Sequence, residues 1–287
     1  MQATRDLDRG RTTAEAVDEQ IERDCAAFVA VQQDAGLDLL ADGMLRWQDL
    51  FRPLLEASEG LEPGALTRFL DTNTFYRAPR ATKAAPQLAE PLGEGYLRPL
   101  PAPRIVTLPS PWALAKGTGL TPRVVAGGIL KPQIEALGPE TDLVVLSEPF
   151  FPRDPGPKLD DLASALEALG VDRRLALQFV FCDARPALEL GLGDLPVDAI
   201  GVDFYLTRPI DLPDGFAKTL LAGVVDARSS LLEDPRELAD FAARLQERVE
   251  DVALVPNGDL QFVAEPIARE KIARLGQARF ALAEEAA

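Results

Sequence analysis

Seven short apolar segments recur along the chain, and each closes on polar or turn-forming residues. They lie at 37–43, 104–112, 142–150, 174–183, 199–205, 220–228 and 252–258. Helix-like segments stand between most of them, and these are clearest at 157–169, 233–249 and 264–284. Apolar strands that alternate with helices predict a parallel sheet. The polar residues at the strand ends are then the first candidates for a functional site.

This arrangement predicts an α/β fold of the TIM (β/α)8 type, because such barrels collect their functional groups at the carboxyl ends of the strands. No glycine-rich phosphate-binding motif follows the first segment, which disfavours a doubly wound dinucleotide-binding sheet. Seven segments leave one strand of eight unaccounted for. A helix is predicted over 11–35, beginning at a capping box of Thr12 and Glu15. The first strand is therefore expected to be absent, irregular or replaced within residues 1–10.

A length of 287 residues suits a single barrel, so residues 1–287 are expected to form one domain. Within it, residues 79–111 hold eight prolines and little periodicity. Such a stretch indicates an ordered excursion or binding loop at the barrel rim, or else a flexible linker.

Charge and composition exclude several classes of function. Lys plus Arg number 30 against 46 Asp plus Glu, so this acidic chain has a formal net charge of −16 and would repel nucleic acids and anionic membranes. No apolar run approaches the ~20 residues that span a bilayer, and the amino terminus is charged rather than apolar, so a cytoplasmic protein is expected. The chain has no histidine, which excludes imidazole-dependent mechanisms for this chain acting alone.

Five segments carry a family resemblance: "AGLDLLADGMLRWQDLFRPLL", "RFLDTNTFYRAP", "VVLSEPFF", "IGVDFY" and "LLAGVVDARSSLLED". In order and spacing they resemble the cobalamin-independent methionine synthase family, from about residue 9 to the carboxyl terminus. That family pairs an amino-terminal barrel, which helps to hold folate polyglutamate, with a zinc-bearing barrel that binds homocysteine. Some members are single barrels. Trp47, Asn73 and the "VDFY" strand look like the amino-terminal barrel, so the resemblance implies a free-standing version of that half and a methyltransferase.

The resemblance also implies where a zinc site would stand, and this chain departs from it. The zinc barrel has a histidine two residues before a cysteine, but here Val180 precedes Cys182. The acidic ligand would fall near Asp203, and Asn257 and Gly258 stand where the last cysteine would be. Because zinc wants three or four ligands rich in Cys and His, no metal is expected here, with Cys182 as the remaining candidate ligand. Zinc is expected on a partner barrel instead.

The stretch "FLDTNTFYRAPR", residues 69–80, brings carboxylate, amide, aromatic and guanidinium groups together. Asp71 and Asn73 suit the amide and amine edge of a heterocycle such as a pterin, and Tyr76 offers a stacking face. The two arginines of the stretch suit the carboxylates of a polyglutamate tail. Alternatively, the Asp and Asn cap a turn and the aromatic side chains plug the barrel end.

The first visible strand is followed by Asp42, Arg46 and Trp47. These side chains are predicted to bind substrate through a buried ion pair and an aromatic wall, or to clamp the loop. At the strand end of "SEPF", Glu148 is predicted to be a catalytic acid or base with a raised pKa, or else to order the neighbouring loop amides.

Asp226 and Arg228 look like the strand-end pair of the family, with Asp226 as a second catalytic candidate and Arg228 as a substrate contact. A loop salt bridge is the alternative. Asp203 is predicted to bind substrate. Cys182 is interpreted as an inert core residue, because it lacks a nearby group that would form its thiolate.

These features predict methyl transfer from a reduced folate or another methyl carrier to homocysteine or a related thiol. The chain is expected to bind the donor, to hold no cofactor by itself and to work with a zinc-bearing partner barrel. Two alternatives stay open: a non-catalytic folate- or small-molecule-binding module, and a degenerate barrel with carboxylate-based lyase or decarboxylase chemistry.

Overall fold

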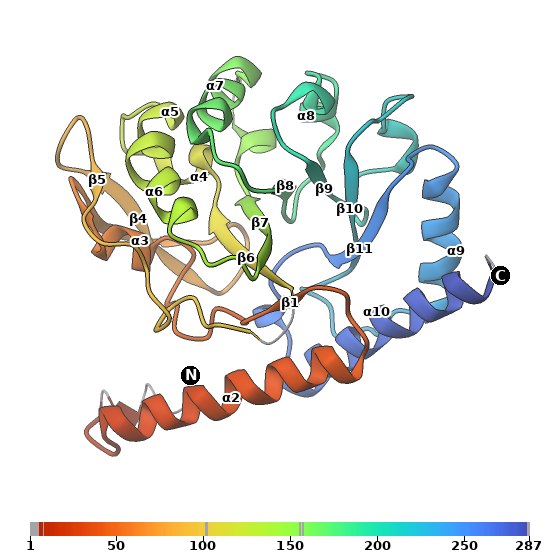
Figure 1. The fold of residues 1–287 in the computed structure, drawn as a ribbon, viewed down its shortest axis with the longest axis horizontal. Coiled ribbons are helices and arrows are strands. Elements are labelled where there is room, and N and C mark those ends of the chain that lie inside the picture. The colour runs from red at the N-terminus through yellow and green to blue at the C-terminus, as the bar shows by residue number, and fades with distance from the viewer. Residues whose placement is uncertain (1–5, 8, 101–102, 155, 157, 286–287) are drawn as a thin grey trace.

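The computed structural model describes residues 6–7, 9–100, 103–154, 156 and 158–285. Its centre is one curved sheet of seven parallel strands (Figure 1). In spatial order these are β1 (Leu40–Ala41), β6 (Arg104–Pro109), β7 (Thr141–Glu148), β8 (Leu175–Phe179), β9 (Ala199–Asp203), β10 (Thr219–Val225) and β11 (Val252–Pro256). All seven predicted strands are confirmed. Each ends two to four residues before its predicted limit, because the closing polar residues form the turns.

The sheet is curled but not closed, so a complete eight-stranded barrel is not formed by the residues that the structure describes. Instead, α2 (Ala14–Asp34) lies on β1, α10 (Glu265–Glu285) lies on β11, and the two helices contact each other across the opening (Figure 1). The described part of residues 1–10 contains no strand, while residues 1–5 and 8 lie outside the description. A pair of long helices therefore stands where the missing strand was expected.

All four predicted helices are confirmed: α2, α7 (Leu159–Leu169), α9 (Pro235–Gln246) and α10. The amino-terminal cap of α2 is Thr13, whose hydroxyl accepts from the Ala16 N–H, so the prediction that Thr12 caps this helix was wrong by one residue. None of the described helices combines the length and the apolar character that a membrane crossing requires. Shorter helices complete the outer layer: α3 (Arg52–Glu56), α4 (Pro111–Ala115), α5 (Pro122–Val125), α6 (Lys131–Glu135) and α8 (Arg185–Leu188).

Alternate residues of each strand enter two separate cores. On β7, Val144 and Leu146 pack outward into the large core beneath the helices, whereas Leu143 and Val145 fill the inside of the curled sheet. This division is what the twofold alternation of a strand produces when both faces of a parallel sheet are covered.

The chain leaves the central sheet well before the predicted proline-rich stretch 79–111. An antiparallel hairpin of β3 (Leu61–Arg68) and β4 (Phe75–Ala81) precedes it, and β2 (Ser58–Glu59) pairs with β5 (Gln87–Leu88). The stretch 69–80 is therefore the tip and second strand of this hairpin. Its alternation was hidden because Pro63 pairs with Pro79 and a bulge follows Pro63.

Candidate functional site

Asn257 lies at the centre of the carboxyl edge of the sheet, where β9, β10 and β11 end. Its Nδ2 donates to Oδ1 of Asp203 at 3.2 Å and to Oδ1 of Asp226 at 3.4 Å, while its own Oδ1 accepts from the Ala227 N–H at 2.9 Å. One amide thus joins two strand-end carboxylates. Asp203, Asn257 and Asp226 are called the strand-end triad below. In the sequence, Asn257 stands out as the polar residue that closes the last strand and as the replacement of a cysteine, but it was not predicted to be a site residue.

The Asp203 side chain is fully buried and only half satisfied. Its Oδ1 also accepts from the Tyr205 N–H at 2.9 Å, but Oδ2 has no hydrogen-bond partner among the described residues. Burial raises the pKa of Asp203 to about 6, against hydrogen bonds from Asn257 and Tyr205 that lower it. The strand-end triad therefore contains a buried carboxylate oxygen that has no described hydrogen-bond partner.

A buried ion pair supports the loop after β10. Nζ of Lys271 donates to both carboxylate oxygens of Glu233, at 2.8 and 2.9 Å, and to the Leu231 carbonyl at 2.6 Å. Oε1 of Glu233 also accepts from the Asp226 N–H at 2.9 Å and from the Tyr205 hydroxyl at 3.0 Å. Sequence reasoning missed this pair. The available signal was a lysine at an apolar position of the 264–284 helix.

Arg228 and Asp71 come from distant segments and meet at the rim. Nη1 of Arg228 lies 3.4 Å from Oδ1 of Asp71, at the hairpin tip, and the guanidinium lies 4.7 Å from the ring centre of Phe181. Asn73 of the same tip is exposed and accepts from Arg68 at 3.0 Å. The alternative interpretation expects a loop salt bridge between Asp226 and Arg228, but the Arg228 guanidinium pairs with Asp71, and Arg228 contacts Asp226 through its backbone N–H at 3.0 Å.

Aromatic side chains of the hairpin reach the ends of other strands. The ring centre of Phe69 lies 6.2 Å from that of Phe262, on which it stacks, and 6.4 Å from that of Phe150. The ring centres of Phe262 and Phe181 are 5.3 Å apart in an edge-to-face contact, and those of Tyr76 and Phe150 are 6.2 Å apart. We call these five residues the aromatic cover. It packs as the plug interpretation expects, and ligand stacking on Tyr76 stays a prediction.

Glu148 is fully buried, and both of its carboxylate oxygens accept hydrogen bonds from neighbouring loop residues. Oε1 accepts from the N–H groups of Phe150 at 2.6 Å and Phe151 at 2.8 Å, and Oε2 accepts from the Ser110 hydroxyl. Burial raises the pKa of Glu148 to about 7, although these hydrogen bonds oppose the rise. The raised pKa and the ordering of loop amides are both present, and a catalytic role stays a prediction.

The pKa of Glu148 predicts a pH-dependent stability. Because the folded pKa of about 7 lies above the ordinary value of 4.5, the folded state binds more protons in this window. The stabilisation is complete below the ordinary pKa and is lost as the pH rises through the folded pKa, by an amount on the order of 3 kcal/mol. We expect Glu148→Gln to remove this dependence. Urea unfolding of both proteins at several pH values measures the free energy of unfolding. An equal change of this free energy with pH in the two proteins would contradict the prediction.

The residues after β1 form a loop clamp rather than the predicted ion pair. Asp42 accepts from the N–H groups of Met44 at 2.9 Å and Arg98 at 3.1 Å. Arg46 turns away and pairs with Asp18 of α2 at 2.6 Å, so the prediction of a buried ion pair of Arg46 with Asp42 or Asp49 is wrong. Trp47 is buried in the large core and donates from Nε1 to the Tyr96 carbonyl at 3.1 Å. Substrate binding by these three residues stays a prediction.

The residues at the expected zinc position do not fit that metal. Burial strongly raises the pKa of the Cys182 thiol, which disfavours the thiolate that zinc requires. A Cβ atom on Gly258 would lie 2.3 Å from the ring of Phe181, so that ring fills the space beside Gly258. Within the described ranges, no group of three or more His, Cys, Asp or Glu side chains could hold a metal ion.

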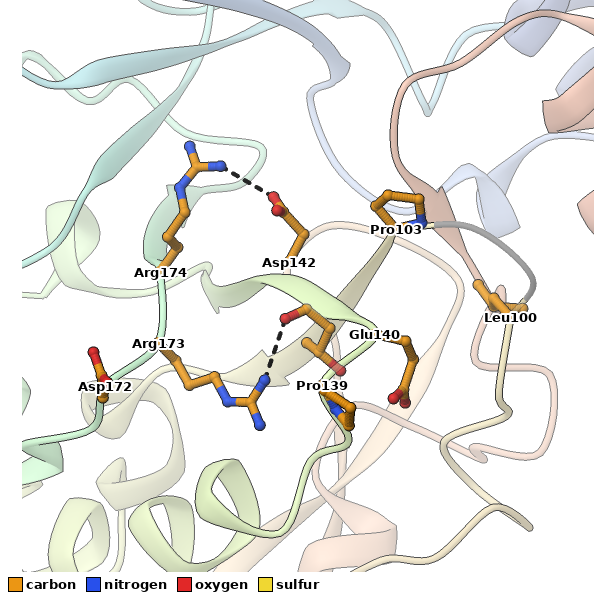
Figure 2. Close-up of a pocket in the computed structure, with 9 residues that line it drawn as sticks. Leu100, Pro103, Pro139, Glu140, Asp142, Asp172, Arg173 and Arg174 are labelled. Atoms are coloured by element: carbon orange, nitrogen blue, oxygen red, sulfur yellow. Dashed lines mark hydrogen bonds and ion pairs between the residues drawn. The ribbon is translucent and has the colours of Figure 1, made fainter.

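A hollow of about 510 Å³ lies at the opposite edge, beside the amino ends of β6, β7 and β8 (Figure 2). Several of its charged residues are already engaged: Asp142 and Arg174 lie 3.0 Å apart, and Glu140 lies 2.9 Å from Arg104, which is buried beside the hollow. Arg173 donates to backbone carbonyls. Functional groups of α/β barrels collect at the carboxyl edge, so this hollow is not the candidate site.

Two solved structures share this fold. A B12-independent methionine synthase from Shewanella sp. W3-18-1, in complex with selenomethionine, matches with a TM-score of 0.74 at 17% identity, over 96% of this chain and 91% of that chain. A Listeria monocytogenes protein, provisionally assigned as a vitamin B12-independent methionine synthase, gives a TM-score of 0.68 at 14% identity, over 100% and 93%. No protein-family model and no curated protein matches. The chain therefore has the fold of these methionine synthase structures, matched over nearly their whole length.

Proposed function

We propose that this chain takes part in methyl transfer from a reduced folate or another methyl carrier to homocysteine or a related thiol. Its part is to bind the methyl donor at the carboxyl edge, while a zinc-bearing barrel of the same family activates the thiol. Zinc lowers the pKa of bound ligands and so favours a thiolate, and the residues around Cys182 do not fit that metal. A cytoplasmic location belongs to the same proposal.

The strand-end triad is the single observation that supports this proposal most. It presents carboxylate and amide groups at the carboxyl edge of a methionine synthase fold, where the groups can orient a polar donor. Asp226 is the member proposed to contact the donor, because its side chain is part-exposed whereas Asp203 and Asn257 are buried. In this proposal the donor at the carboxyl edge is also contacted by Arg228, Asp71, Asn73 and Tyr76.

A reconstitution assay tests the proposal. The chain is mixed with a zinc-loaded single-barrel methionine synthase, and methyl transfer from 5-methyltetrahydrofolate to homocysteine is followed. We expect the chain to bind the folate, to be inactive alone and to raise the rate of the mixture. Folate binding without any rate increase would instead support the non-catalytic module. Turnover by the isolated chain would contradict the need for a partner.

Asp226→Asn is expected to weaken folate binding roughly tenfold, because it removes one charged acceptor while keeping the oxygen that receives the Arg228 and Asn257 donors. Isothermal titration measures the change. Asp183→Asn is the matched control, since Asp183 also follows a strand at this edge and its Oδ1 accepts a local N–H from Arg185. Equal losses in both variants would exclude a specific role for Asp226.

A further inference from the structure

We propose that the outward face of the β3–β4 hairpin is a docking surface for an acidic segment of another protein, one with apolar and carboxylate side chains in alternation. This face is formed by Leu66 and Arg68 of β3 and by Phe75 and Arg77 of β4, and it is called the hairpin face below. The inference holds whatever reaction the chain takes part in, because none of the four residues belongs to the strand-end triad or the aromatic cover.

The pairing register places all four side chains of the hairpin face on the same side of the hairpin. They form two opposite pairs of the antiparallel ladder: Leu66 with Arg77, and Arg68 with Phe75. Opposite residues share a face and successive residues alternate, so the pair between them points to the other side. That intervening pair contains Tyr76, whose ring centre lies 5.2 Å from that of the buried Phe51. The side of Tyr76 is therefore the inner one, and the hairpin face points outward.

The apolar side chains of the hairpin face are open to solvent. Leu66 is 60% exposed and Phe75 is 53% exposed. Diagonal neighbours in an antiparallel pair lie about 7–8 Å apart, so one partner can cover both side chains. Removing their apolar surface from water would favour association by roughly 25 cal/mol for each Å² that is buried.

The guanidinium groups of the hairpin face have no carboxylate partner among the described residues. Arg68 donates to the Thr72 carbonyl and to Oδ1 of Asn73, and Arg77 donates to the Gly64 carbonyl at 3.2 Å. In a chain with 46 acidic and only 30 basic residues, two exposed or part-exposed arginines without a carboxylate are unusual. Because guanidinium groups bind carboxylates strongly and in a defined geometry, the hairpin face favours an acidic partner.

The size of the hairpin face favours a short segment over a second copy of this chain. Four side chains are far fewer than the roughly 20–30 residues that each partner of a standard interface supplies. Residues two apart on a strand lie about 7 Å apart, so an extended segment matches the face when apolar and acidic side chains recur at every second position. The net charge of −16 opposes an acidic partner only weakly here, because salt screens charges beyond about 8 Å.

Fluorescence polarisation with a labelled peptide tests the inference on the whole protein. The peptide has the sequence Leu-Thr-Glu-Thr-Leu-Thr-Glu with both ends blocked, and two control peptides replace its Glu by Gln or its Leu by Ser. We expect the first peptide to bind saturably and more weakly as salt is added, and each control peptide to bind at least roughly tenfold more weakly. No saturable binding of the first peptide, or equal binding of the Gln peptide, would overturn the inference.

Arg68→Gln and Phe75→Ala supply the protein variants. Each should weaken binding of the acidic peptide roughly fivefold, since one removes a charge and the other an apolar contact from an exposed site. The matched controls lie on α10: Arg269→Gln removes an exposed arginine that pairs with Glu265, and Phe280→Ala removes a phenylalanine that is 55% exposed. Both controls should bind as the wild type does. Unchanged affinity in the two folded hairpin variants would refute the docking surface.

Two other occupants of the hairpin face give different results. Free γ-linked triglutamate carries the carboxylates of a folate tail without apolar side chains. If it displaced the labelled peptide as well as unlabelled peptide does, the hairpin face would belong to the methyl-donor site. If analytical ultracentrifugation showed that the wild type self-associates and that Phe75→Ala does not, a second copy would cover the face. We expect neither result, and either one would overturn the inference.

Discussion

Lys271→Met is expected to lower the free energy of unfolding by about 3–5 kcal/mol, because it leaves the Glu233 carboxylate buried without its countercharge. The Lys271 side chain is 0% exposed and that of Glu233 is 8% exposed, so solvent cannot replace the lost contacts. Glu233 also receives the Asp226 N–H and the Tyr205 hydroxyl, so the loop after β10 should loosen with it. Chemical unfolding at neutral pH measures the loss.

The pH dependence and a double variant identify the cause of that loss. Burial raises the pKa of Glu233, but the Lys271 ammonium and the other hydrogen bonds outweigh it and hold the pKa below its usual range. The stabilisation is therefore present above the ordinary glutamate pKa of 4.5 and is lost as the pH falls below it. The gap between the wild type and Lys271→Met should shrink in acid. Adding Glu233→Gln should recover part of the loss at neutral pH, and a double variant no more stable than the single one would contradict this account.

The strands and long helices were predictable because their signals are local. Each strand is an apolar run bounded by turn residues, and helices such as α7 and α9 follow from spacing alone. The β3–β4 hairpin was not predictable in this way, since its paired prolines and bulge interrupt the alternation. Its place depends on long-range contacts, such as Asp71 with Arg228 and Phe69 with Phe262.

The candidate site was predictable only in part for the same reason. Asp203 and Asp226 stand out as acids that close apolar strands, and the parallel sheet then places them at one edge. Which atoms pair depends on geometry that the sequence does not carry. Arg46 was expected to pair with an aspartate of its own loop, Asp42 or Asp49, but it pairs with Asp18 of α2 instead. Asn257 joins the two acids only because β9, β10 and β11 are adjacent.

Gly276→Ala is expected to destabilise the protein by about 3 kcal/mol, although alanine is the better helix former by about 1 kcal/mol. The reason is the crossing of α2 and α10, the two helices that bridge the open side of the sheet. A Cβ atom at position 276 would lie 1.9 Å from the Ala35 carbonyl oxygen. That carbonyl cannot move freely, because the Ala35 N–H is bonded to Val31 at the end of α2. The helices would have to separate and strain the nearby ion pair of Arg279 with Asp38.

Gly127→Ala is the matched control for this crossing. Gly127 also lies in a helical segment, but it is exposed and an added Cβ atom meets nothing within 4 Å. This change should stabilise the protein by up to about 1 kcal/mol, since only helix propensity acts. Opposite signs for the two substitutions, measured by urea unfolding, would show that the open sheet depends on close contact between α2 and α10. If the Gly276→Ala protein were as stable as the Gly127→Ala protein, the stability of the fold would not depend on close contact between α2 and α10.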